Sequence, residues 1–137
     1  MSTPRITLEI PSSPDNLSRV EKFLDDLKRI CDISEEIYFN ILVAVSEAVT
    51  NAIVHGNKNN QEKMVSIDVF HDKSICVFTI EDEGEGFDYT KIKSPTLVDS
   101  FLKISGRGIL LMKKLSRHLR FCKNGSCVKM FFYTRSL

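Results

Sequence analysis

The stretch "SEAVTNAIVHGN", residues 46–57, decides the fold of this chain. It ends a long apolar run, "IYFNILVAVSEAVTNAIVHGN", which predicts a buried helix that continues to about His55. Within this run Glu47, Asn51 and His55 follow one another at steps of four, so they share one helical face. Because an unpaired buried polar group costs on the order of a few kcal/mol, this stripe predicts a ligand or a partner.

Length and composition indicate one globular domain over residues 1–137, of which 42% are hydrophobic and 27% charged. The net charge of +1 gives no electrostatic attraction to nucleic acid or to an anionic membrane, so we expect neither as a direct partner. The start "MSTPRITLEIP" lacks the apolar core of a signal peptide, and no apolar run reaches the roughly 18 residues that span a bilayer. These features predict a cytoplasmic protein.

The four cysteines form no CxxC pair, and the histidines are not at metal-ligand spacing from them, so no zinc site is predicted. Cys122 and Cys127 flank "KNGS", and Asn-Gly is a strong signal for a two-residue hairpin turn. Such a hairpin would place the two sulfurs opposite each other on neighbouring strands. For a cytoplasmic protein we favour two reduced thiols.

Hydrophobic periodicity predicts the remaining elements and their order. Gly56 is placed to stop the buried helix. In the last helix we expect Ile109, Leu110, Met112 and Leu115 to point inward. The order is a strand at 6–10, a helix at 17–30, the buried helix, strands at 64–71 and 74–81, a long loop, a helix within 107–119 and a strand pair within 119–134. It predicts an α/β (α+β) two-layer sandwich with a mixed, mostly antiparallel sheet and helices on one face.

Two glycine-rich segments bracket the long loop: "DEGEGF", residues 82–87, and "SGRG", residues 105–108. Glycines at a strand end allow the backbone to approach a ligand where a Cβ would clash. Asp82, at the end of a strand, is placed to accept a hydrogen bond from a ligand amino group. A glycine-rich turn that leads into a helix offers free backbone N–H groups and the positive end of the helix dipole, which suits a phosphate.

The polar stripe fits the same chemistry. The side-chain oxygen of Asn51 can join phosphate oxygens in holding Mg²⁺, and Glu47 can accept a proton from an attacking hydroxyl or water. Each feature taken singly also has a plainer interpretation: a solvated helix face, a simple turn, or a helix start without a ligand. For His55, an interaction with the helix C-terminus is favoured over catalysis.

Together the three segments resemble the GHKL nucleotide-binding superfamily, which has the Bergerat-type ATP-binding fold. "EAVTNAIVHGN" is similar to its N box, "DEGEGF" to its D-x-G-x-G box, and "GRGILLM" to its second glycine box. The short length and the form "VSEAVTNAIVHG" resemble the branch of anti-sigma-factor serine/threonine kinases. The resemblance implies ATP-dependent phosphorylation of an anti-anti-sigma (STAS-type) protein and sequestration of a sigma factor. Relatives commonly form homodimers, and the apolar residues of the first strand and helix suit either such a face or a core.

The resemblance also implies residue roles. Glu47 corresponds to the general base, Asn51 to the Mg²⁺ ligand, and Asp82 to the residue that reads the adenine amine. Where the family has a threonine near the adenine, this chain offers Ser126 or Cys127. The implied nucleotide-binding set is Asn51, His55, Asp82, Gly84, Gly86, Phe87, Gly106, Arg107, Gly108 and Ser126, with a lid at about 89–105.

One departure from the family pattern leaves an alternative open. Ile104 stands where relatives often carry an arginine before the serine of the phosphate turn, so Arg107 or Lys103 would have to supply that charge. The alternative is a nucleotide-gated regulatory binding protein without significant kinase activity. A detached histidine-kinase catalytic domain would need a phosphoacceptor helix from another chain, and a degenerate domain would keep the fold but bind no nucleotide.

Overall fold

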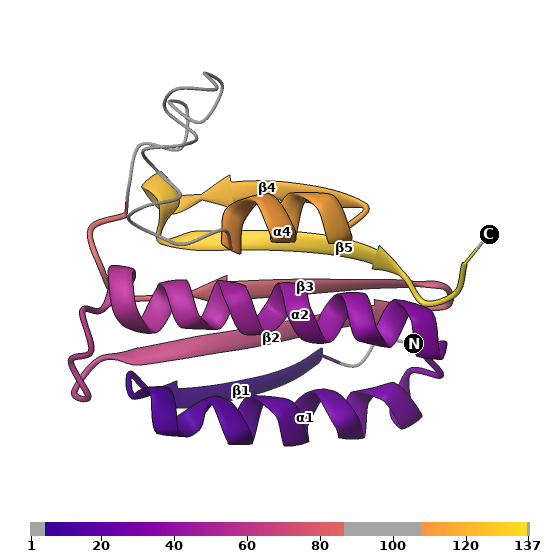
Figure 1. Cartoon of the computed structure of the whole chain (residues 1–137), viewed down its shortest axis with the longest axis horizontal. Helices are drawn as coiled ribbons and strands as arrows, with labels where there is room; N and C mark the ends of the chain where they lie inside the picture. Colours follow the sequence, from indigo (N-terminus) through magenta and orange to yellow (C-terminus); the bar gives the residue numbers. More distant parts are fainter. Residues whose placement is uncertain (1–4, 87–107, 137) are drawn as a thin grey trace.

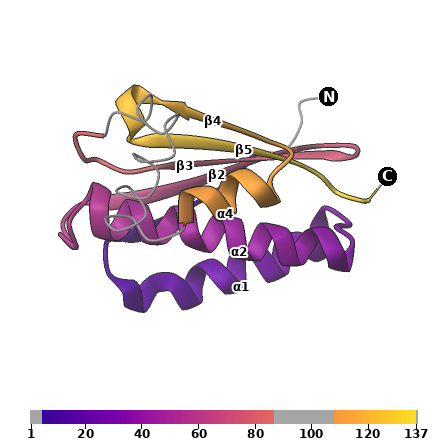
Figure 2. The ribbon, with the colours of Figure 1, turned by 45° about the horizontal axis from the view of Figure 1, so that its top comes forward.

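The computed structural model describes residues 5–86 and 108–136, which form one five-stranded sheet with three α-helices on one of its faces (Figures 1 and 2). The strand order is β1-β2-β3-β5-β4. The predicted two-layer sandwich is therefore confirmed, but "mixed" is wrong, because all four strand pairings are antiparallel. The elements are β1 Arg5–Pro11, α1 Leu17–Ile30, α2 Glu35–Asn51, β2 Met64–Asp72, β3 Ile75–Glu81, α4 Gly108–Leu115, β4 His118–Cys122 and β5 Cys127–Tyr133.

The alternating pattern of the strands turns one set of apolar side chains toward the helices. In the register of β2 with β3, Ile67 pairs with Ile80 and Val69 with Phe78. All four are at most 2% exposed. Because a shift by one residue would move this whole set to the other face, burial of this face fixes the register.

Helix α2 crosses the middle of this face between α1 and α4 (Figure 1). With its π-helical end, Ala52–Gly56, it is long and apolar enough to cross a membrane by length and composition alone, so our expectation of no such segment is wrong for the residues described. A single helix of this kind is weak evidence for a membrane span, since the core helix of a globular domain passes the same test. The buried residues of α2 belong to the core between the helices and the sheet: Ile41, Ala44, Val45, Ala48 and Val49.

The helical segment ends at Gly56, as predicted, but not through the left-handed glycine cap on which that prediction rested. Gly56 is not among the described glycines with positive φ, which are Gly86 and Gly125. The chain stays right-handed through Asn57, whose φ is −91°. Gly56 therefore does not form a left-handed helix cap.

Helix α4 is shorter than the range 107–119 within which we predicted it. It ends at Leu115, and β4 already begins at His118. Ile109 and Met112 are buried as expected, but Leu110 is 40% exposed, so its inward assignment is wrong. One turn of helix cannot place residues 109, 110 and 112 on the same narrow face, because neighbouring residues lie about 100° apart.

Candidate functional site

A cavity of about 410 Å³ lies where α2, β3, α4 and the β4–β5 hairpin meet. Its size and its mostly apolar lining with a few polar groups are typical of sites for small organic ligands. The apolar walls come from Ala48, Ala52, Ile80, Ile109, Met112 and Val128. The polar side chains on its lining are Asn51, His55, Lys58, Asp82 and Ser126.

The polar stripe of α2 runs from this cavity to the start of α4. Asn51 and His55 line the cavity, whereas Glu47, half-buried, lies one turn back toward the middle of the helix. A Cβ placed on Gly108 would lie 2.8 Å from Glu47 Oε2 and 3.1 Å from Asn51 Nδ2. The first residue of α4 therefore packs directly on the Glu47–Asn51 segment, and only glycine leaves both side chains in place.

Asp82 is held in the cavity by two glycines. The Gly84 N–H donates to Asp82 Oδ1 at 2.8 Å. A Cβ on Gly56 would lie 2.3 Å from Asp82 Oδ2, and a Cβ on Gly84 would lie 2.1 Å from the Gly56 carbonyl oxygen. Gly56 is thus needed because the Asp82 carboxylate packs on its backbone. Our sequence reasoning missed Gly56 and Lys58 as residues of the site, since only the fold brings residues 56–58 to the end of β3.

Burial raises the pKa of the Asp82 carboxyl above its ordinary value, and Glu81 adds to the rise. The Gly84 hydrogen bond and Lys63 act in the opposite direction without cancelling it. A desolvated carboxylate gains more from a hydrogen-bond donor than a solvated one does. Asp82 is therefore suited to accept a bond from a ligand that enters the cavity.

The β4–β5 hairpin closes the cavity on the side opposite α2. Its Asn-Gly pair has the positive φ angles of a type I′ turn, 58° at Asn124 and 94° at Gly125. The Asp82 N–H donates to the Ser126 carbonyl oxygen at 2.9 Å. Gly86, at φ 81°, passes under the hairpin so closely that a Cβ would lie 2.0 Å from the Asn124 carbonyl oxygen. The hairpin and the "DEGEG" turn therefore pack closely against each other and share a backbone hydrogen bond.

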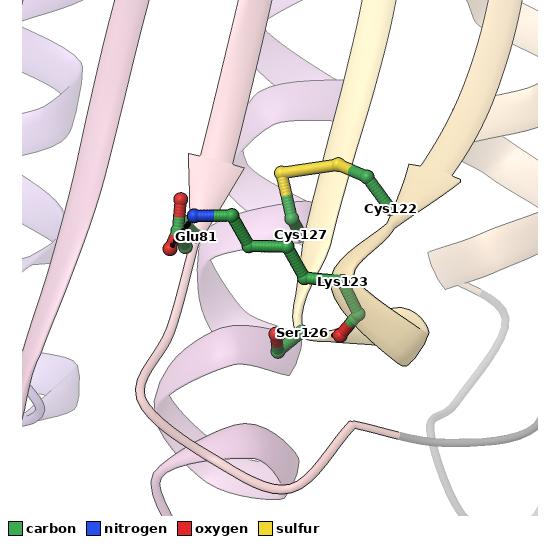
Figure 3. The surroundings of a disulfide bond; sticks show 5 residues. All are labelled: Glu81, Cys122, Lys123, Ser126 and Cys127. Carbon is green, nitrogen blue, oxygen red and sulfur yellow. Dashed lines mark hydrogen bonds and ion pairs between the residues drawn. A yellow bond between two sulfur atoms is a disulfide. The ribbon is translucent and has the colours of Figure 1, made fainter.

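Cys122 and Cys127 are joined by a disulfide at the base of this hairpin (Figure 3). The favoured expectation of two free thiols is thus contradicted, although the predicted cross-strand pairing of these residues is confirmed. Next to the bond, Lys123 Nζ lies 2.7 Å from Glu81 Oε2, which ties the hairpin to β3. Cys127 lines the cavity beside Ser126, so the disulfide supports one wall of the site.

We expect reduction of this disulfide to lower the free energy of unfolding by about 2 kcal/mol, the chain-entropy value for so short a loop. Denaturant unfolding with and without a dithiol reductant measures the effect. The variant C122A/C127A serves as control and should not respond to reductant. If the variant and the wild type respond equally, the effect comes from another source.

Several predicted site residues fall outside the residues described: Phe87, Gly106, Arg107, Ile104 and the whole lid at 89–105. Of those described, Asn51, His55, Asp82, Gly86 and Ser126 line the cavity. Glu47, Gly84 and Gly108 are not on its lining, but Gly108 lies against Glu47 and Asn51, and Gly84 lies against Gly56 and Asp82. In the described part of the chain no group of three or more His, Cys, Asp or Glu residues is placed to hold a metal ion.

Comparison with known proteins agrees with this geometry. The profile described as a histidine kinase-like ATPase domain matches residues 10–132. Proteins named anti-sigma F factor from Bacillus cytotoxicus and Bacillus thuringiensis are 35% identical to this chain over 97 residues. The alignments cover 69% of this chain and 66% of each relative, so the chain spans just under two thirds of their length.

Among solved structures, the chain is similar to the RsbU and RsbW domains of Rv1364c from Mycobacterium tuberculosis. The TM-score is 0.68 at 13% sequence identity. The match covers 96% of this chain and 32% of that one. At this identity the likeness concerns the fold, and it extends over nearly all of the chain.

Proposed function

The chain belongs to the histidine kinase-like ATPase domain family, as its resemblance to the GHKL superfamily predicted, and from this premise we propose that it is an ATP-dependent serine/threonine protein kinase acting as an anti-sigma factor. The observation that carries the proposal is the Asp82 carboxylate, held by Gly56 and Gly84 in an apolar cavity. The relatives named anti-sigma F factor support the regulatory role.

Adenine fits the cavity by its chemistry. A flat aromatic base suits walls made of alanine, isoleucine, methionine and valine side chains. The exocyclic amine of the base is a donor, and Asp82 supplies the matching acceptor on the lining. Ser126, on the hairpin side, offers a hydroxyl where the family has a threonine, and its Oγ donates to the Lys123 carbonyl oxygen at 2.9 Å.

The phosphates would extend from the adenine toward Asn51 and the start of α4. Asn51 offers a neutral oxygen on the cavity lining, and a nucleotide would supply the further oxygens that Mg²⁺ prefers. When bound, Mg²⁺ neutralises the charge that develops on the transferred phosphoryl group. We assign the N-terminus of α4, with Gly106, Arg107 and Gly108, to the phosphates, and His55 and Lys58 to the rim.

Glu47 would then act on the substrate hydroxyl. It lies one helical turn from Asn51 and against Gly108, next to the region assigned to the phosphates. As the hydroxyl oxygen of a serine or threonine attacks the γ-phosphorus, Glu47 would accept its proton while ADP leaves. The proposed substrate is an anti-anti-sigma (STAS-type) protein, and the second proposed partner is a sigma factor. We keep the homodimer and the cytoplasmic location as proposals.

The test combines binding with transfer. A ligand that binds only the folded state raises its stability by about 2.7 kcal/mol at a concentration of 100 times the Kd. We therefore expect Mg-ATP to raise the thermal midpoint and Mg-GTP to raise it less. Labelled ATP should then transfer its γ-phosphate to a cognate STAS-type protein and not to that protein with its acceptor serine or threonine replaced by alanine.

A nucleotide-gated binding protein without kinase activity is the second candidate, because Ile104 leaves the phosphate turn without the arginine that many relatives have there. In that case Mg-ATP would still stabilise the chain and change its affinity for a sigma factor. No label would appear on any candidate antagonist, however, so the transfer assay separates the two functions.

The raised pKa of Asp82 makes nucleotide affinity depend on pH. We expect the affinity for adenosine to fall as the pH decreases through this pKa, because the neutral carboxyl is a weaker acceptor for the amine. The stability of the ligand-free chain should change the other way. A carboxyl whose pKa is raised in the fold contributes stability at low pH that is lost as the pH rises through the raised value.

Calorimetric titration with adenosine, from the ordinary aspartate pKa upward, measures this dependence. Adenosine is chosen because it has no phosphates that titrate in the same range. D82N is the control: it removes the titrating group and should make both the affinity and the ligand-free stability less dependent on pH. An unchanged pH profile in D82N would mean that another group is responsible.

A further inference from the structure

Asn57 is buried directly behind the cavity without lining it. It is the residue after Gly56 in the chain, and it is 2% exposed. The Nδ2 group donates to Ser12 Oγ at 2.8 Å and to the Met64 carbonyl oxygen at 3.0 Å. The Oδ1 atom accepts from the Glu83 N–H at 2.8 Å. Both ends of the carboxamide are thus used, and they join three segments that are distant in sequence.

These bonds close a ring around the residue that follows Asp82. The Met64 N–H donates to Glu83 Oε2 at 2.5 Å, while Asn57 binds both the Met64 carbonyl and the Glu83 N–H. Glu83 is therefore fixed through its backbone and its carboxylate. The ring sets where the chain leaves β3, and so where the Asp82 side chain begins.

The same short segment controls Asp82 from two sides. Gly56 forms the surface on which the Asp82 carboxylate packs, and Asn57 holds the next residue, Glu83. The Glu83 N–H bond to Asn57 Oδ1 is partly buried, so without this acceptor the turn after Asp82 would lose its direct tie to the end of α2 and gain freedom to move. Any such movement rotates Asp82 relative to a base in the cavity.

We propose that Asn57 is a positioning residue for base recognition, which aims Asp82 at the exocyclic amine of adenine through its bond to the Glu83 backbone. The proposal rests on the proposed function, since it presupposes an adenine nucleotide in the cavity. It concerns the choice of base and not phosphoryl transfer, because the Asn57 bonds all lie at the Asp82 end of the site.

A role in general stability and a role in aiming Asp82 predict different results. ITP carries an oxygen in place of the adenine amine, so it cannot use the Asp82 acceptor in the same way. Aiming predicts that N57A weakens ATP binding by about tenfold or more while ITP binding changes little. General destabilisation predicts that both nucleotides weaken by the same factor.

The experiment measures ATP and ITP affinities by calorimetry for wild type, N57A and S12A. Ser12 is buried and binds the same carboxamide, but S12A leaves the Asn57–Glu83 bond intact. S12A should therefore lose stability and keep the wild-type preference for ATP. In a D82N background, N57A should have no further effect on ATP affinity, because its effect passes through Asp82.

N57D covers the case in which N57A does not fold. Aspartate has nearly the same shape, keeps the acceptor for the Glu83 N–H and loses both donors, so it should retain the preference for ATP. A folded N57D that has lost this preference overturns the proposal, and so does an N57A with the wild-type ratio of ATP to ITP affinity. A wild type that binds no ATP would instead refute the proposed function itself.

Discussion

Replacing Glu47 by alanine is expected to abolish phosphoryl transfer and to leave ATP binding nearly unchanged. A positioned general base contributes roughly 10²- to 10⁴-fold to the rate, so the loss should be of that size. Glu47 does not line the cavity assigned to adenine, and it lies against Gly108 beside the phosphate end. The initial rate of label transfer to a cognate STAS-type protein and the Kd for ATP, measured on the same preparation, test both halves.

Two further variants make the Glu47 experiment specific. E47Q keeps the size of the side chain and removes its basicity, so it should lose nearly as much rate as E47A. E36A changes an exposed glutamate near the start of the same helix and should leave the rate intact. Phosphorylation at the wild-type rate by E47A would exclude Glu47 as the base, whatever the binding data show.

The sequence predicted those parts of the fold that depend on local patterns. The alternation of Ile6, Leu8 and Ile10 and the helical spacing of Val20, Leu24 and Leu27 are visible without the structure, because each element needs one buried face. The helix covering of the sheet followed from the order of these elements. The all-antiparallel pairing did not, since the partner of a strand depends on contacts distant in sequence.

The residues of the candidate site likewise divide into those that local sequence patterns predict and those that only the fold brings together. Asn51 and Asp82 could be found as members of motifs, and Ser126 or Cys127 only from the place of the family threonine; all four line one cavity. Gly56 could not be assigned correctly, because a glycine at the end of a helix has a sufficient local explanation as a cap. Its contact with Asp82 joins residues 26 positions apart in the chain, and only the folded backbone reveals it.

The prediction that Cys122 and Cys127 are free thiols was wrong for a different reason. The register of Cys122 opposite Cys127 was predictable from the Asn-Gly turn. Whether two facing thiols are joined depends also on the redox environment, which residue patterns do not encode. We expected free thiols because we expected a cytoplasmic protein, whereas the structure has a disulfide between these two residues.

Replacing Gly84 by alanine is expected to weaken nucleotide binding by on the order of 100-fold, because the bound state needs Asp82 in a position that the added Cβ makes about 3 kcal/mol less favourable. A Cβ at this position would lie 2.1 Å from the Gly56 carbonyl oxygen and 2.9 Å from Asp82 Oδ1. The first of these is a backbone atom, which does not shift cheaply, and the side chain of the next residue, Asn57, makes three hydrogen bonds. The turn must therefore move, and Asp82 moves with it. Calorimetric titration with Mg-ATP measures the loss.

The matched control for G84A is E85A, which adds no atom and changes an exposed residue of the same turn. E85A should stay within about 0.5 kcal/mol of the wild type, as surface substitutions usually do. Since Gly84 is not among the described residues with positive φ, backbone strain cannot account for a loss in G84A. The loss would therefore report the close packing of this turn on the end of α2. Wild-type affinity in G84A would show that this packing is not required, and the assignment of Asp82 as the adenine acceptor would lose its structural basis.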